Sequence, residues 1–263
     1  MAMPDGFRQA KEITKKHAKT FYFASHFLGR AEKYAAYAIY AFCRTHDDAV
    51  DVANQELNAD LIAAFQETVT KYQIPKEYFN ALKSGVNMDL SKNRYQDFAE
   101  LYDYCYKVAG VVGLIMLKIF SNTDNKAEKY AVDLGIAMQL TNILRDIKED
   151  FARGRIYLPL DEMQSHCVNE IGIRQERLND NFRALMRFQT QRARQYYQES
   201  LPGIKLIPGV KSRFCLLAMK NIYAGILEKI ERNNYDVYKE RAHVNMLGKI
   251  TIILKILFKG EYL

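Results

Sequence analysis

The segment from Tyr130 to Ile147 reads YAVDLGIAMQLTNILRDI, and its pattern indicates the fold class. Its apolar residues recur every three or four positions, as they do along one face of an α-helix. The segment from Tyr34 to Val50, YAAYAIYAFCRTHDDAV, has the same period. Alternation of apolar and polar residues, which is typical of strands, is nearly absent elsewhere in the sequence. These patterns predict an all-α protein.

The distribution of proline supports the same fold class. Proline occurs only at positions 4, 75, 159, 202 and 208, so two stretches of about seventy and eighty residues contain no residue that breaks a helix. We expect helices over roughly 5–24, 31–53, 57–72, 75–86, 96–121, 125–152, 178–200, 208–233 and 242–258, with an irregular stretch at 153–177. Nothing resembles an interdomain linker or a tandem repeat, so we predict a single domain over residues 1–263.

Length and composition exclude several classes of protein. The chain has 263 residues, of which 49% are apolar, so it can bury a sizeable core and is not intrinsically disordered. A net charge of +7 favours anionic partners, and nucleic acid, a membrane surface and a phosphorylated small molecule all fit it. The 4 cysteines show no zinc-ligand spacing, and no apolar run approaches the ~20 residues of a membrane span. No signal peptide is apparent, so we expect a reduced, cytoplasmic protein.

A first polar stripe lies in the segment 37–51. Tyr37, Tyr40, Arg44, Asp47 and Asp51 are spaced 3, 4, 3 and 4 residues apart, so on a helix they share one face. An exposed acidic patch is the simplest interpretation of such an aspartate pair. The tyrosines on the same stripe favour a second interpretation, in which the stripe faces inward and has a function.

A second polar stripe runs from Gln139 to Asp150. Gln139, Asn142, Asp146 and Asp150 are spaced 3, 4 and 4 residues apart in an otherwise apolar helix. Burying such a face is costly unless the carboxylates are paired. If the two stripes face each other, each pair of like charges costs about 2–3 kcal/mol, which protons or cations must offset. Hard divalent cations take oxygen ligands, and Mg²⁺ favours carboxylates completed by water and phosphate oxygens. The two stripes therefore predict Mg²⁺ and a diphosphate.

Longer stretches of the sequence resemble a known family. The matching segments are AIYAFCRTHDDAVD at 38–51, YCYKVAGVVG at 104–113 and AMQLTNILRDIKEDFARGRIYLP at 137–159, with weaker support from 17–25 and 221–241. The chain resembles the squalene/phytoene synthases, which join two prenyl diphosphates head to head on the all-α isoprenoid synthase fold with its central cavity. The spacing is most like bacterial members that make presqualene diphosphate, with phytoene and dehydrosqualene synthases as close alternatives.

The resemblance implies a set of site residues. Two or three Mg²⁺ ions would be held by Asp47, Asp51, Asn142, Asp146 and Asp150. Farnesyl or geranylgeranyl diphosphate would be bound by His17, Lys19, Arg44, Arg145, Tyr223 and Arg241, with Thr20, Gln139, Arg155 and Tyr157 close by. Phe21, Tyr40 and Tyr104 would line the pocket where carbocations form, because an aromatic face stabilises a cation without quenching it. The reaction either stops at a cyclopropylcarbinyl diphosphate or continues to squalene, dehydrosqualene or phytoene.

Three other interpretations concern a reductant, a hydrolase and a binding module. Reducing relatives bind NADPH, but the chain has no G-x-G turn and nothing else in it supports that cofactor. His46 beside Asp47 would suit an HD-type phosphohydrolase, which leaves the second stripe unexplained. A basic helical module that binds a membrane or nucleic acid is the non-enzymatic alternative, although no feature specifically supports nucleic acid. The sequence leaves the oligomeric state open.

The last residues, 246–263, combine apolar residues with Lys249, Lys255 and Lys259. Such a basic amphipathic helix either packs on the bundle or lies on an anionic membrane. The second interpretation predicts a cytoplasmic protein with a peripheral contact on the inner face of the membrane.

Overall fold

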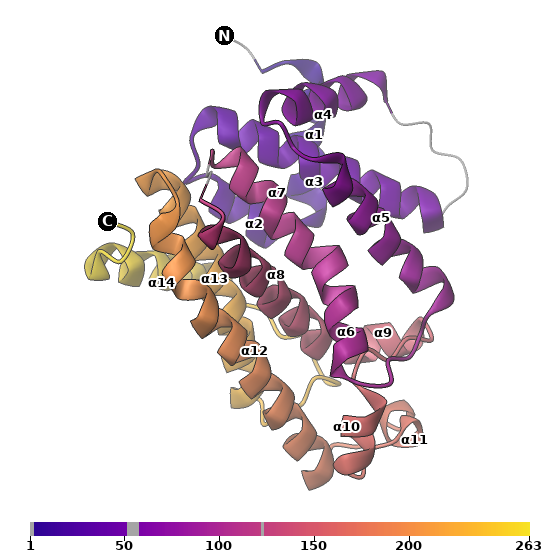
Figure 1. The fold of residues 1–263 in the computed structure, drawn as a ribbon. Helices are drawn as coiled ribbons and strands as arrows, with labels where there is room; N and C mark the ends of the chain where they lie inside the picture. The colour runs from indigo at the N-terminus through magenta and orange to yellow at the C-terminus, as the bar shows by residue number, and fades with distance from the viewer. Residues whose placement is uncertain (1–2, 52–57, 122–123) are drawn as a thin grey trace.

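The computed structural model describes residues 3–51, 58–121 and 124–263, and the side chains of residues 46–51 are not among those described. The described residues form helices and no strand, which confirms the all-α prediction (Figure 1). The elements are α1 (Asp5–His17), α2 (Lys19–Ser25), α3 (Arg30–Asp51), α4 (Ala59–Lys71), α5 (Lys76–Ser91), α6 (Phe98–Cys105), the π-helical turn η1 (Tyr106–Gly110), α7 (Val111–Ile119), α8 (Lys126–Arg145), α9 (Ile147–Ala152), α10 (Leu160–Ser165), α11 (Glu170–Arg174), α12 (Asp180–Leu206), α13 (Val210–Arg232) and α14 (Met246–Lys259).

Helix α8 lies at the centre of the bundle. It contacts α7, η1, α12 and α13, and Figure 1 shows it running between α7 and α12. Neighbours on several sides explain why α8 is apolar around most of its circumference. Its polar Thr141 is satisfied internally, since its hydroxyl bonds the Tyr197 hydroxyl of α12 at 2.9 Å.

Two glycines let neighbouring backbones approach α8. A Cβ atom on Gly135 would lie 2.3 Å from the carbonyl oxygen of Ala109, and one on Gly113 would lie 2.3 Å from that of Ala131. No side chain fits at such distances. Gly113 therefore allows α7 to pack closely on α8, and Gly135 allows α8 to pack closely on η1.

Several predicted helix boundaries were wrong. The expected helix 5–24 is interrupted at Ala18, and the expected helix 96–121 consists of α6, η1 and α7. The expected helix 125–152 breaks at Asp146, and the expected irregular stretch 153–177 contains α10 and α11.

The expected break at Pro202 is also absent. Helix α12 continues through this proline to Leu206. Its last turn is held by packing, because Ile204 is 4% exposed and Gly203 lies against Tyr130, where a Cβ atom would come within 2.1 Å of that side chain. Tertiary contacts here outweigh the local cost of proline.

Candidate active site

A largely apolar cavity of about 290 Å³ lies inside the bundle. Its walls come from α2, α3, η1, α7, α8, α12 and α13. Small side chains such as Ala36, Ala109 and Ala131 face it and leave the space that larger residues would fill.

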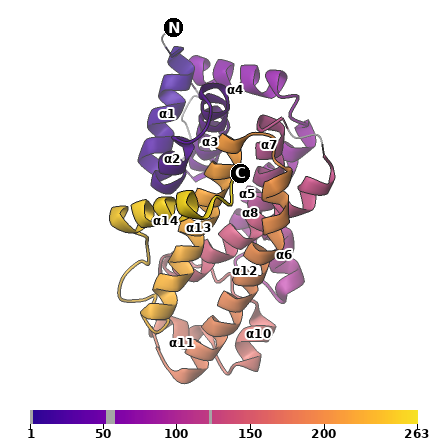
Figure 2. The same ribbon diagram turned by 90° about the vertical axis from the view of Figure 1, so that its left-hand side faces the viewer.

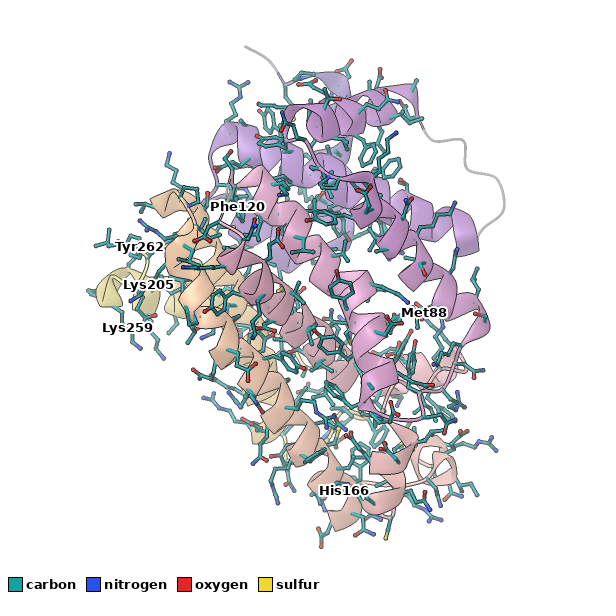
Figure 3. The ribbon with its side chains drawn as sticks, in the orientation of Figure 1. Met88, Phe120, His166, Lys205, Lys259 and Tyr262 are labelled. Carbon is teal, nitrogen blue, oxygen red and sulfur yellow. The ribbon has the colours of Figure 1, made fainter. Side chains whose placement is uncertain are left out.

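The cavity is polar at one end and apolar at the other. Helix α8 lines it from Ala127 to Asn142, a distance of about 23 Å at 1.5 Å per residue. Near the N-terminal end of α8 the walls include Phe120 and Ile207, and Figure 3 shows Phe120 at the end of α7. Near the C-terminal end they include Gln139 and Asn142, whose side chains approach each other at 3.4 Å. A long amphiphilic molecule matches this gradient.

One turn beyond Asn142, Asp146 forms the centre of a charged cluster. Arg241 donates two hydrogen bonds to its carboxylate, from Nε at 2.7 Å and from Nη2 at 2.9 Å. Arg145 donates from Nε at 2.7 Å and makes a second, short contact through Nη2. The Arg241 bonds connect the segment after α13 to the C-terminal end of α8, although Arg241 and Asp146 are 95 positions apart in the sequence. Two guanidinium groups beside the polar end of the cavity form an anion-binding arrangement.

The two aspartates at this end differ in their protonation behaviour. Burial alone would raise the pKa of Asp146, but hydrogen bonds from Arg145 and Arg241 outweigh burial and lower that pKa. Burial raises the pKa of Asp150 to about 7, and the negative charge of Asp146 adds to the increase. A bound cation would remove this penalty on the Asp150 carboxylate.

A buried tyrosine cluster surrounds Asp89. The Asp89 carboxylate accepts hydrogen bonds from the Tyr157 hydroxyl at 2.7 Å and from the Tyr104 hydroxyl at 3.1 Å. The Tyr104 and Tyr157 rings stack with centroids 5.1 Å apart. Arg155 donates to the Asp89 backbone carbonyl at 3.1 Å. Asp89 thus joins α5 to the segment that follows α9.

Comparison with known proteins identifies the family. Residues 14–62 and 55–248 match the family model for squalene/phytoene synthase. The chain is 34% identical to the 15-cis-phytoene synthase of Synechococcus elongatus, with 95% of this chain and 91% of that protein covered. It is 36% identical to phytoene synthase 2 of Oryza sativa, with 95% and 69% covered. This chain belongs to the squalene/phytoene synthase family.

Solved structures agree with the squalene/phytoene synthase assignment. A dehydrosqualene synthase superposes with a TM-score of 0.90 at 27% identity, over 98% of this chain and 97% of that one. The squalene synthase HpnC of Alicyclobacillus acidocaldarius superposes with a TM-score of 0.80 at 26% identity, over 88% and 95%. The chain is therefore a prenyltransferase of the isoprenoid synthase fold. The comparisons support neither a phosphohydrolase nor a non-enzymatic binding module.

The structure brings together many of the residues predicted for a squalene/phytoene synthase. Those that line the cavity are Phe21, Tyr40, Gln139, Asn142 and Tyr223. The Phe21 and Tyr40 rings are 5.9 Å apart and tilted by 39°. His17 and Lys19 are exposed at the junction of α1 and α2, Thr20 is half-buried there, and Arg44 is half-buried on α3. Asp47 and Asp51 belong to the last turns of α3, but their side chains lie outside the described residues.

The structure places Tyr104 in the tyrosine cluster around Asp89. Its side chain is only 4% exposed and is not among the residues that line the large cavity, because it packs against Tyr95 and Tyr157 instead. Asp89, which accepts its hydrogen bond, was not singled out from the sequence. A lone aspartate near the end of a helix carries no local signal of function, and only the tertiary fold places it beside the tyrosines.

The pKa of Asp150 predicts a pH-dependent stability. A carboxyl whose pKa is about 7 in the folded protein and near 4 when unfolded stabilises the fold at low pH and loses that contribution as pH rises from about 4 to 7. We therefore expect Asp150→Asn to raise the unfolding temperature of the metal-free protein at pH 8, with a smaller gain at pH 5. Thermal unfolding in EDTA measures both values.

The control for this experiment is Asp103→Asn, because Asp103 is exposed and pairs with Lys107 at 2.6 Å. It should show no comparable gain at pH 8. Equal stability of Asp150→Asn and the wild type at pH 8 would contradict the raised pKa.

Proposed function

We propose that this chain condenses two molecules of geranylgeranyl diphosphate head to head and that Mg²⁺ assists the loss of diphosphate. The observation that carries the proposal is the long apolar cavity whose polar end lies beside Asn142 and the Asp146 cluster. Family membership supports head-to-head condensation of prenyl diphosphates. The twenty-carbon substrate is favoured because the relatives at 34% and 36% identity are phytoene synthases.

The donor set at the polar end fits Mg²⁺. Asn142, Asp146 and Asp150 offer hard oxygen ligands at intervals of one helical turn, and burial of Asp150 without a cation raises its pKa. Arg145 and Arg241 together donate two hydrogen bonds to each Asp146 oxygen, so an arginine would turn away from Asp146, toward the diphosphate, when this carboxylate holds metal. In the proposal Asp47 and Asp51 hold metal from α3. The metal would supply a Lewis acid that stabilises the departing diphosphate.

Protein groups would hold the diphosphate in place. Arg145 and Arg241 both contact Asp146. A diphosphate that enters between the end of α8 and the segment around Arg241 would therefore meet two guanidinium groups. The other groups that would bind the diphosphate are His17, Lys19, Thr20, Arg44 and Tyr223. Gln139 would orient the leaving group. Arg155 and Tyr157 are held nearby by their hydrogen bonds to Asp89.

The apolar part of the cavity would protect the carbocation. Phe21 and Tyr40 face the cavity from α2 and α3 and present aromatic surface to it. An aromatic face stabilises a desolvated cation by about 2 kcal/mol and offers no nucleophile. Walls such as Leu134 and Met138 exclude the water that would otherwise capture it.

Product analysis tests this proposal. The purified protein is incubated with farnesyl or geranylgeranyl diphosphate, with Mg²⁺ or EDTA and with or without NADPH, and the extract is analysed by mass spectrometry. We expect Mg²⁺-dependent diphosphate release and a C40 product from geranylgeranyl diphosphate, in larger yield than any C30 product. Excess Mg²⁺ should restore activity after EDTA.

A C30 product alone would contradict the choice of substrate and leave the condensation intact. A product whose central carbon–carbon bond is saturated only when NADPH is present would show that the enzyme also uses NADPH. Turnover that persists in EDTA would contradict the role of the metal.

A further inference from the structure

Helix α14 is apolar over two adjoining sectors of its circumference, one turned toward the bundle and one turned away from it. Its inward face includes Ile252, Ile253 and Ile256, which pack against the core of the bundle, and Ile256 is only 2% exposed. Successive residues advance by about 100° around a helix, so these three lie within one third of the circumference. This face accounts for the contact between α14 and α13.

The outward face of α14 is apolar as well. It consists of Met246, Leu247, Ile250, Leu254, Leu257 and Phe258, all of which are classed as exposed. Leu247 is 75% exposed and Phe258 is 88% exposed. At about 100° per residue the six side chains occupy a continuous sector of about 120°. A packed terminal helix needs only its inward face, so packing on the bundle leaves this second face unexplained.

The charges on α14 are all positive. The helix contains 3 lysines and no acidic residue, as its sequence MLGKITIILKILFK shows. At about 100° per residue Lys255 lies roughly 60° beyond the Phe258 edge of the outward face and Lys259 roughly 100° beyond it, and Lys259 lies 3.5 Å from Glu261. Lys249 lies over the Phe23 ring at 5.6 Å, and burial and nearby Lys19 lower its pKa. Long lysine side chains at the edge of an apolar face can reach anionic head groups.

The position of α14 leaves its outward face accessible. Figure 2 shows the helix at the margin of the bundle, across α13 and beside α2, and Figure 3 shows Lys259 and Tyr262 at that margin. Contact between Lys249 and Phe23 confirms that α14 lies next to α2, which carries cavity residue Phe21. No helix in the described part of the chain is long and apolar enough to cross a membrane.

We propose that the outward face of α14 docks on the surface of an anionic lipid bilayer, with the helix axis parallel to that surface. The six apolar side chains enter the head-group boundary, and the lysines meet the lipid phosphates. The same lysines disfavour a second copy of the chain, whose matching face would carry the same charge. One helical stripe is also small against the roughly 800 Å² per partner of a stable interface.

Vesicle flotation without substrate tests the docking surface independently of the proposed function. Vesicles of phosphatidylcholine alone are compared with an equal mixture of phosphatidylcholine and phosphatidylglycerol. We expect the wild type to float with the anionic vesicles, and Leu247→Gln with Phe258→Gln to lower the partition coefficient by roughly thirtyfold. Lys255→Gln with Lys259→Gln should reduce the preference for anionic vesicles by roughly tenfold.

The matched control is Leu90→Gln with Ile171→Gln, which removes two apolar residues that are 60% and 57% exposed on other faces. This variant should bind like the wild type, and circular dichroism should show the same unfolding temperature for all variants. The proposal is overturned if the wild type does not float or if the control binds as weakly as the α14 variant. It is also overturned if light scattering shows a dimer that the α14 variant dissociates while vesicle binding is absent.

Discussion

Replacing Asp146 with alanine is expected to lower the turnover of prenyl diphosphates by about a thousandfold or more. The substitution removes a proposed metal ligand and the carboxylate that holds Arg145 and Arg241 together. Both losses act on the departing diphosphate, whose developing charge those groups would stabilise. Diphosphate release measured with Mg²⁺ at saturating substrate gives the loss directly.

The half-buried Arg145 makes a second variant necessary. Its side chain is only 13% exposed, so Asp146→Ala leaves a guanidinium without its partner and can reduce stability. Asp146→Asn keeps the shape and part of the hydrogen bonding. Both variants should be inactive while Asp146→Asn keeps the wild-type circular dichroism spectrum, and exposed Asp103→Ala should remain active. Wild-type turnover by folded Asp146→Asn would refute the role assigned to this carboxylate.

Replacing Gly135 with alanine is expected to destabilise the fold by about 3 kcal/mol. The added Cβ atom would lie 2.3 Å from the carbonyl oxygen of Ala109 and 2.9 Å from the backbone nitrogen of Gly110. Backbone atoms cannot rotate away as a side chain can, so α8 must move relative to η1. For a chain of this size we expect the unfolding temperature to fall by about 6–12 °C.

The matched control is Gly172→Ala on the exposed helix α11. Its Cβ atom would meet nothing closer than 3.5 Å, and alanine favours a helix over glycine by up to about 1 kcal/mol. We expect its unfolding temperature to equal or exceed that of the wild type. A Gly135→Ala protein as stable as the wild type would show that the contact between α8 and η1 is looser than the structure indicates.

The fold class could be predicted from the sequence because helical periodicity is a local property. The apolar repeats at 34–50 and 130–147 predict helices, and the structure contains α3 and α8 there. The boundaries were less predictable. At Pro202 the local preference for a break is overcome by the burial of Gly203 and Ile204, which depends on residues far away in the sequence.

Part of the candidate site could also be predicted from the sequence. Gln139, Asn142 and Asp146 are one helical turn apart, so their shared face follows from spacing alone. The residues that pair with them cannot be predicted from that spacing. Arg241 reaches Asp146 only because the segment after α13 returns to the end of α8. The outcome for Tyr104 shows the same limit, since its neighbours Tyr157 and Asp89 are 53 and 15 positions away.

The sequence by itself determined an all-α chain with two polar stripes and a basic amphipathic terminal helix, because each of these is a pattern of spacing along one helix. Only the tertiary structure decided what those stripes face. It placed Phe21 and Tyr40 in the wall of the cavity and Tyr104 against Tyr157, and it left the outward face of α14 exposed among the described residues. Packing between distant segments sets such relations, and no periodicity within one segment encodes them.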